Sequence, residues 1–225
     1  MKLALISDIH SNLPALEAVL AEIRRLGIAR ILNAGDNVGY NAFPNETLSV
    51  LAREGVESIR GNHDIASITG DFSRLNPTAA SAEEGTCKGL SVQSSDFLMA
   101  LREYQELDIE GLRFAVHHGA PFDPWEYVRD YFVSGLHLEK ANAEVLVLGH
   151  THWPYALRLD KGFVVNPGSA GQPRDGDWRA SFATMEIVRG KVMEAVIRRV
   201  EYDVKRTMGA NRKAGLPEIL ADSHH

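Results

Sequence analysis

Residues 3–10 read LALISDIH, in which four apolar residues are followed directly by Ser7, Asp8, Ile9 and His10. A short run that is apolar on both faces is typical of a strand buried within a parallel or mixed sheet. Asp8 and His10 lie two residues apart at the end of this strand, so both side chains can point into one crevice. The stretch therefore predicts an α/β fold in which the end of the first strand carries part of a site.

The segments that follow repeat this order of strand, polar loop and helix. Asn12 can cap a helix whose apolar residues recur at helical spacing as far as Gly27. Alternation of strands with helices implies right-handed crossovers, and polar residues at the carboxyl ends of such strands mark the binding crevice. The predicted elements of this half are a helix at 13–26, a strand at 30–33 ending in Gly35-Asp36, a helix at 44–54, and a strand at 56–60 ending in Gly61-Asn62-His63-Asp64.

The second half of the chain is predicted to be richer in strands. Residues 70–95 have weak periodicity and indicate an insertion that could cover the site. We expect helices around 97–104, 127–133 and 136–142, strands at 112–116 and 145–148 that lead into His117-His118-Gly119 and Gly149-His150-Thr151-His152, antiparallel hairpins at 155–166 and 181–200, and a helical tail at 203–222.

Composition places the chain among ordinary globular proteins. With 225 residues, 44% hydrophobic and 24% charged, it can form one domain over 1–225. The net charge of −6 gives no general attraction to nucleic acid or to a membrane surface, and we expect no dedicated nucleic-acid module. Cys87 is the single cysteine and the apolar amino terminus is too short for a leader or a membrane span, so we expect a cytoplasmic protein. The terminal His224-His225 pair is interpreted as a frayed tail or an expression scar.

Several of these polar side chains are metal ligands by type. Mn, Fe, Ni and Zn ions favour mixed imidazole and carboxylate ligands, and a site for two ions also needs a carboxylate that can bridge them. One histidine at a strand end is more often a hydrogen-bonded surface residue than a ligand. Here five strand ends carry such residues, and His150 and His152 repeat the two-residue spacing of Asp8 and His10. The pattern therefore predicts a centre for two metal ions.

Five blocks of sequence resemble, in order and spacing, the signature of the calcineurin-like metallophosphoesterases, and in particular their small bacterial and archaeal phosphodiesterase-like branch. The resemblance extends over about residues 1–200. It implies a four-layer α/β sandwich of two facing mixed β-sheets flanked by helices, and hydrolysis of phosphoester or phosphoanhydride bonds by a hydroxide that bridges two divalent metals. The blocks are Asp8-Ile9-His10, Gly35-Asp36-Asn37-Val38-Gly39, Gly61-Asn62-His63-Asp64, His118-Gly119 and Gly149-His150-Thr151-His152.

The same resemblance implies roles for individual residues. His63 would act as general acid near the leaving oxygen, and Asp64 would either hold the His63 imidazole or cap the segment that follows. His118 is preferred to His117 as a ligand, because consecutive strand side chains point in opposite directions and Gly119 follows His118. By resemblance, one metal would be held by Asp8, His10 and His152, the other by Asn62, His118 and His150, with Asp36 bridging them; Mn, Fe, Ni or Zn would suit these ligands, and Mg is also considered.

Two loops bear on the substrate. Arg174 lies in a loop that resembles a segment after the last ligand block in this branch, and its guanidinium could clamp phosphate; an ordinary surface arginine is the alternative. The residues after Asp36 are Asn37-Val38-Gly39-Tyr40-Asn41, and the arginine found there in the protein-phosphatase branch is missing. Specificity for phosphoproteins is therefore less favoured.

The expected substrate is a small phosphorylated or nucleotide compound, either a phosphodiester or a dinucleoside polyphosphate. A serine/threonine-type protein phosphatase and a nuclease are the alternative enzymes, and the acidic balance of the chain weighs against the nuclease. A protein-binding scaffold of the same fold is the alternative that is not an enzyme, because some relatives keep the sandwich after losing ligands or the acid histidine.

Overall fold

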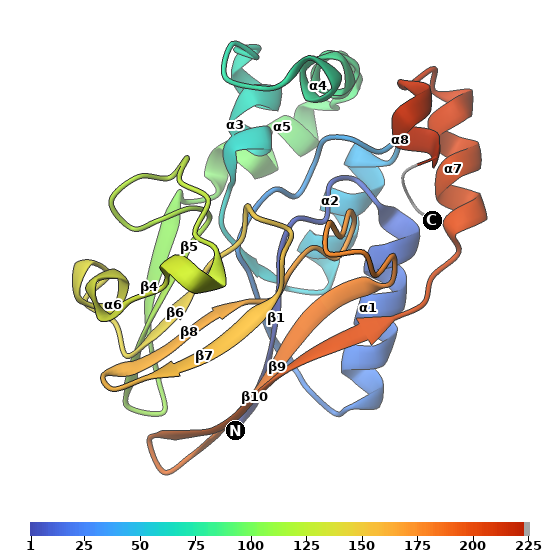
Figure 1. Ribbon diagram of the computed structural model, residues 1–225. Helices are drawn as coiled ribbons and strands as arrows, with labels where there is room; N and C mark the ends of the chain where they lie inside the picture. Colours follow the sequence, from blue (N-terminus) through green and yellow to red (C-terminus); the bar gives the residue numbers. More distant parts are fainter. Residues whose placement is uncertain (223–225) are drawn as a thin grey trace.

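Two β-sheets face each other in the computed structural model, which describes residues 1–222 (Figure 1). His224 and His225 lie outside the described residues. The first sheet contains, in spatial order, β10 (Lys191–Val200), β9 (Ala180–Val188), β1 (Lys2–Ile6), β2 (Arg30–Asn33) and β3 (Glu57–Ser58). The second contains β4 (Tyr104–Ile109), β5 (Leu112–His117), β6 (Val145–Val147), β8 (Gly162–Asn166) and β7 (Tyr155–Leu159).

The first sheet is mixed because its central strand, β1, has one parallel and one antiparallel neighbour. Leu5 of β1 pairs with Leu32 of the parallel strand β2 and with Ala183 of the antiparallel strand β9. The crossover from β1 to β2 is α1 (Leu13–Arg25), whose first turn is capped by Asn12 through a 3.3 Å hydrogen bond from the Ala15 amide. The predicted succession of strand, helix and strand is confirmed here.

The second sheet is also mixed. Its strands β5, β6 and β8 run parallel, while β4 and β7 are antiparallel to their neighbours at the two edges. The two hairpins predicted after residue 155 are confirmed, β7 with β8 in this sheet and β9 with β10 in the first. The parallel strands β5 and β6 therefore bring the segments after His117 and Val147 to the same edge of the sheet.

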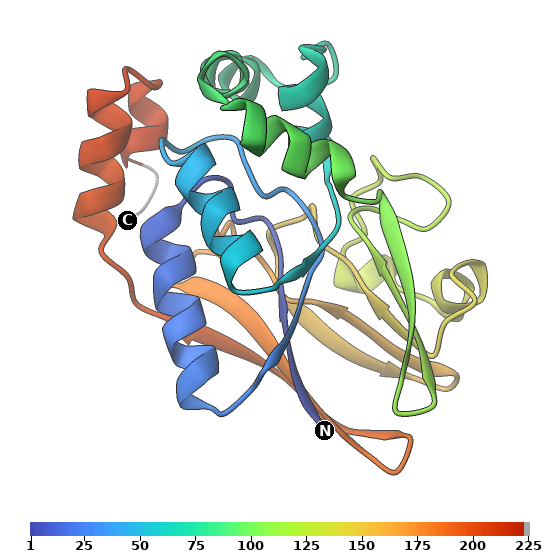
Figure 2. The same cartoon turned by 180° about the vertical axis from the view of Figure 1, so that it is seen from behind.

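Apolar side chains pack at three interfaces: between the two sheets, and between each sheet and the helices outside it. Leu5 and Leu32 of the first sheet pack with Phe114 of the second between the sheets. The outer face of the first sheet is covered by α1, α2 (Pro44–Arg53) and α5 (Val92–Ala100), and the second sheet packs against α6 (Gly135–Lys140) through Leu138 and Leu146 (Figure 2). The predicted four-layer sandwich is confirmed.

Further helices lie near the end of the sheets at which β1 and β2 finish (Figure 1). They are α3 (Asn62–Thr69) and α4 (Pro77–Gly89), together with α7 (Val204–Lys213) and α8 (Glu218–Asp222) of the tail. The tail is broken at Gly215 and Pro217 as the sequence predicts. None of the helices within residues 1–222 is both long and apolar enough to cross a lipid bilayer.

Four predicted elements differ from the structure. The weakly periodic segment 70–95 contains α4 and the start of α5. The helix predicted at 97–104 ends earlier, at Ala100, and strand β4 begins at Tyr104. The strand predicted at 56–60 is reduced to two residues. The helix predicted at 127–133 is wrong: a single 3-10 turn, Asp130–Phe132, stands there, and none of its residues is buried. A short helix without an apolar face against the core gains too little from packing to form.

Candidate metal centre

Side chains from several strand ends meet at one edge of the two sheets. Among the described residues they form three overlapping groups, all buried, in which the donor atoms lie within 4.8 Å of one another. Asn62, a seventh expected ligand, adjoins them with its Oδ1 3.0 Å from His118 Nε2. The groups are Asp8, His10 and His152; His10, Asp36 and His63; and Asp36, His118 and His150. The structure thus brings together all the ligands expected from the sequence, with His63 beside them.

The first group converges from the loop after β1 and the loop after β6. His10 Nε2 and His152 Nε2 lie 3.0 Å apart. The Oδ1 atom of Asp8 is 3.4 Å from His152 Nε2 and 3.8 Å from His10 Nε2. Two imidazole nitrogens and a carboxylate oxygen therefore surround one point, as three ligands of a cation do.

The second group lies against the first. His118 comes directly after β5, and its ring lies 4.9 Å from that of His150, measured between ring centroids. The His150 amide donates to both Asp8 carboxylate oxygens, at 3.2 and 3.1 Å, and so ties the two groups together. Asn62 contributes an amide oxygen, which is an ordinary partner for a divalent cation.

Asp36 stands between the two groups. Its Oδ2 is 3.6 Å from His10 Nε2 in one group and 3.2 Å from His118 Nε2 in the other. Its Oδ1 accepts a 2.9 Å hydrogen bond from the His63 amide, which fixes the plane of the carboxylate. One oxygen is thereby held by the backbone, and the other faces ligands of both groups.

Backbone carbonyls orient the imidazoles. Because a carbonyl can only accept, the Nδ1 atoms that contact one must carry the proton, and Nε2 is then free to bind a cation. The Nδ1 contacts are His10 to Val38 O at 3.1 Å, His118 to Ala34 O at 2.8 Å and His152 to Gln172 O at 2.6 Å. His150 is reversed: its Nε2 lies 3.3 Å from Trp125 O, which leaves Nδ1 free.

Burial shifts the pKa values of several of these side chains. Burial raises the pKa of Asp8 to about 7 and lowers the pKa of His150 to about 3. Burial also opposes the charge on His118, but the neighbouring Asp36 carboxylate outweighs it and raises the His118 pKa to about 9. Buried carboxylates and imidazoles whose donor atoms lie within 4.8 Å of one another fit a site for divalent cations.

The backbone is unusual where the ligands lie. Positive φ angles near 50–70° occur at ligand positions, a region that costs a residue with a side chain about 1–3 kcal/mol. Gly149 precedes His150 in a space so tight that an added Cβ would overlap Ser7 Oγ. The ligands in this conformation are Asp8, His10, Asp36, His150 and His152.

Asp64 and His63 are neighbours in the first turn of α3 but point to different partners. The Asp64 carboxylate accepts from the amides of Gly61, Asn37 and Val38 at 2.9–3.0 Å, which caps α3 and holds the loop after Asp36. No hydrogen bond joins Asp64 to His63 among the described residues; successive helical residues diverge by about 100°. Of the two roles considered for Asp64, its contacts are those of the cap.

The carboxylate beside His63 belongs instead to Glu83 of α4. Its Oε1 lies 2.5 Å from His63 Nδ1, and Glu83 has no exposed surface. Glu83 is not among the residues predicted from the sequence, because it sits in the weakly periodic segment 70–95, 20 residues from its partner. An acidic residue on the inner side of a helix, next to Ala79 and Ala82, is the signal that could have indicated it.

Arg174 lies beside the first group. Its amide is 3.4 Å from His152 O, and its Nη2 donates to Tyr40 Oη at 3.2 Å and to Gln172 Oε1 at 3.0 Å. His117, in contrast, points away from the centre and stacks on Tyr104 with ring centroids 5.2 Å apart.

Comparison with known proteins agrees with this geometry. The family model described as the calcineurin-like phosphoesterase superfamily domain matches residues 1–190. An uncharacterised protein of Methanocaldococcus jannaschii is 34% identical over 98% of this chain and 96% of its own length. The phosphodiesterase YfcE of Escherichia coli is 29% identical over 79% of this chain and 83% of its own.

A solved structure extends the likeness to the whole fold. The crystal structure of a metallophosphoesterase from Sphaerobacter thermophilus has a TM-score of 0.84 and 33% sequence identity, and covers 100% of this chain and 98% of that chain. Together these matches show that the chain belongs to the calcineurin-like phosphoesterase superfamily and is a metal-dependent hydrolase of phosphoric esters.

Proposed function

We propose that this protein uses two divalent metal ions to hydrolyse a small phosphodiester or phosphoanhydride. The observation that carries the proposal is the position of Asp36 Oδ2, 3.6 Å from His10 Nε2 and 3.2 Å from His118 Nε2. A carboxylate shared by two ligand groups is able to bridge two ions. In the proposal, Asp8, His10 and His152 complete one site, and Asn62, His118 and His150 complete the other, with Mn, Fe, Ni or Zn as the ions.

In the proposed reaction, side chains of the protein transfer the proton and bind the phosphoryl group. When bound by these residues, two cations would supply an activated water and would neutralise charge on the phosphoryl group. His63 gives a proton to the leaving oxygen, and Arg174 binds phosphoryl oxygens through its guanidinium. Helix α4 covers this edge of the centre, which supports treating residues 70–95 as a cover within one domain, 1–225.

Aromatic side chains near the centre favour a substrate with a planar group, such as a nucleotide. The Tyr127 ring lies 4.0 Å from the His150 ring, and half of the Tyr127 side chain is exposed. Arg74 packs over Trp125 at 4.0 Å, close to the same ligand. An exposed aromatic face offers a nucleobase a stacking surface. This supports a dinucleoside polyphosphate or a nucleotide phosphodiester over a phosphoprotein.

The alternatives receive less support. The residues after Asp36 lack the arginine of the protein-phosphatase branch, and Tyr40 among them is buried rather than open to a phosphopeptide. A protein-binding scaffold without activity does not require seven metal-binding side chains that converge on one site. The cytoplasmic location also stays a prediction, which rests on the single cysteine Cys87.

A substrate panel tests the proposal. Metal-stripped protein is reloaded with Mn, Fe, Ni, Zn or Mg and assayed on a diester, a monoester, a dinucleoside polyphosphate and a phosphopeptide. We expect turnover of the diester or the polyphosphate, and two ions per chain by mass spectrometry. Absence of turnover with every ion would rule out the enzyme, and preference for the phosphopeptide would favour the protein phosphatase.

Replacing Arg174 with alanine is expected to raise the KM for phosphoester substrates. A hydrogen bond to a charged group contributes roughly 1.5–3 kcal/mol, so kcat/KM should fall about 10- to 100-fold. Arg179→Ala is the matched control, because Arg179 lies in the same loop but pairs with Asp177 at 2.7 Å. Equal kinetics for the two variants would mean that Arg174 does not bind substrate.

A further inference from the structure

Glu83 brings a fully buried carboxylate to the edge of the metal centre. Its Oε1 lies 2.5 Å from His63 Nδ1, and its Oε2 accepts a 2.5 Å hydrogen bond from Ser67 Oγ. A buried carboxylate is costly unless both oxygens find partners, and an apolar pair would fill the same volume without that cost. The pair therefore points to a role that depends on the hydrogen bond to His63.

The chain leaves room for this carboxylate at Gly39. An added Cβ at residue 39 would overlap Glu83 Oε1 and would lie 3.0 Å from His63 Nδ1. Gly39 also has a φ of 98°, which a residue with a side chain rarely adopts. The lack of a side chain at Gly39 thus leaves the space beside the His63 imidazole that the Glu83 carboxylate occupies.

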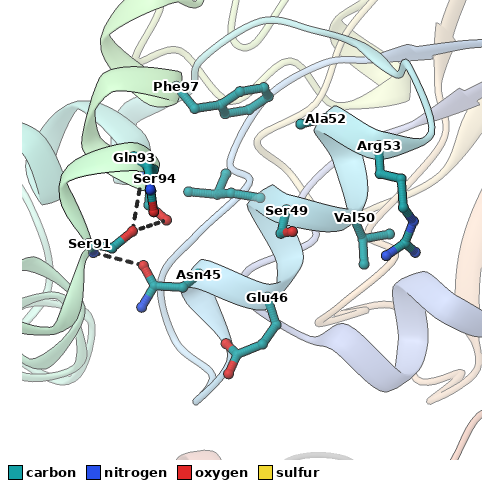
Figure 3. Close-up of a pocket in the computed structure, with 11 residues that line it drawn as sticks. Asn45, Glu46, Ser49, Val50, Ala52, Arg53, Ser91, Gln93, Ser94 and Phe97 are labelled. Carbon is teal, nitrogen blue, oxygen red and sulfur yellow. Dashed lines mark hydrogen bonds between the residues drawn. The ribbon is translucent and has the colours of Figure 1, made fainter.

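Helix α4 is fixed on both sides, so Glu83 cannot move freely. Ala79 and Ala82 on its inner side pack in one cluster with Tyr40, whose ring lies 4.7 Å from the His63 ring. At the far end, Asn45 of α2 donates to Gly89 O at 2.8 Å. Figure 3 shows the Asn45 side chain reaching Ser91, the N-cap residue of α5. Asn45 and Ser91 line a cavity of about 690 Å³ between α2 and α5.

We propose that Glu83 is the positioning residue for His63, accepting its Nδ1–H so that Nε2 is the nitrogen that serves the leaving oxygen. The inference rests on the phosphoesterase activity proposed above. When the bond from phosphorus to the leaving oxygen breaks, its electron pair stays on that oxygen and the proton of His63 Nε2 moves to it. The imidazole keeps its Nδ1–H on Glu83 and returns to its charged form by taking a proton from water.

The test compares two aryl diesters of the same phosphoryl group, one with 4-nitrophenolate and one with unsubstituted phenolate as leaving group. The nitro-substituted oxygen leaves without protonation, whereas phenolate depends on a general acid. In the metal-loaded enzyme, Glu83→Gln should lower kcat for the phenyl substrate about 10- to 100-fold, which is less than the roughly 10²–10⁴-fold contribution of a general acid because the His63 imidazole itself is still present. We expect kcat for the nitrophenyl substrate to fall less than threefold, with KM and metal content unchanged.

Matched variants separate positioning from folding. Glu84→Gln changes the next residue, which is exposed and pairs with Lys88, and should leave both substrates unaffected. Glu83→Asp retains the charge but withdraws it from Nδ1, and provides a second readout should the glutamine variant fold poorly; its loss should again be confined to the phenyl substrate. In a His63→Ala background, Glu83→Gln should cause no further loss, because the two residues act as one unit.

The outcomes distinguish this inference from the proposed function. An inactive wild-type enzyme with every metal would refute the phosphoesterase activity itself. An active wild type in which Glu83 variants lose both substrates equally, or lose metal, would overturn only the positioning role and make Glu83 a structural residue. Additive losses of the Glu83 and His63 variants would also overturn it.

Discussion

Asp36→Ala is expected to empty both metal sites at once and to abolish turnover. Asp36 Oδ2 faces His10 in one group and His118 in the other, so its loss removes a ligand from each. Activity should fall by more than the roughly 10- to 100-fold that accompanies loss of an outer hydrogen-bond partner of a ligand. Metal content by mass spectrometry, measured beside kcat/KM, checks both expectations.

Two further variants sharpen this result. Asp36→Asn keeps an oxygen to accept from the His63 amide but removes the negative charge, so any difference from wild type reports the bridging role rather than the local fold. Asp8→Ala removes a ligand of one group and should lower metal content by about one ion per chain. Retention of one tightly bound ion in Asp36→Ala would show that the carboxylate is not shared.

His63→Ala is expected to retain both metal ions and to lose turnover by roughly 10²–10⁴-fold, the usual contribution of a general acid or base. The loss should be largest for substrates with poor leaving groups. Metal content and kcat on the same preparation provide the measurement. The result matters because His63 also lies within 4.8 Å of donor atoms of His10 and Asp36, a distance at which it could itself be a ligand.

His117→Ala is the control for that experiment. His117 precedes a proposed ligand in sequence but stacks on Tyr104 outside the centre, so its removal should change neither metal content nor kcat by more than about twofold. A fall in metal content for His63→Ala would place His63 among the ligands and would remove it as the acid.

The centre was predictable from the sequence because its residues follow buried strands. Asp8, Asp36 and His150 each lie two or three residues after the end of a buried strand, and parallel strand ends must meet at one edge of a sheet. Asp8 lies two residues before His10, and His150 lies two residues before His152, so the same spacing of potential ligands occurs at two strand ends. Local pattern and ligand chemistry coincide at these positions, so the residues could be selected before their distances were known.

Glu83 could not be selected in this way. Its contact with His63 depends on how α4 packs against Tyr40, and the alanine-rich inner side of α4 gives little hydrophobic periodicity. The same limit applies to Asp64, for which the sequence left two roles open. Side-chain direction within one helical turn, rather than adjacency in sequence, decided which carboxylate reached the imidazole.

The secondary-structure elements were likewise predictable only where burial produces a clear hydrophobic pattern. The buried strands and α1 were predicted closely because their periodicity reflects burial on one or both faces. β4 was missed because its alternating exposed residues, among them Tyr104, Glu106 and Asp108, follow a helical run without a break. Its pairing with β5 in the second sheet overrides local propensity there.

The ligand positions with left-handed backbone bear on whether folding or the cation places the ligands. In small zinc domains the cation drives the polypeptide to fold, and removing it unfolds the chain. Here the sheets and their packed cores hold the loops of Asp8, Asp36 and His150 in their strained form. We therefore expect the packed sheets to keep these loops in place when a chelator removes the cations, so that one ion can be exchanged for another without unfolding of the chain.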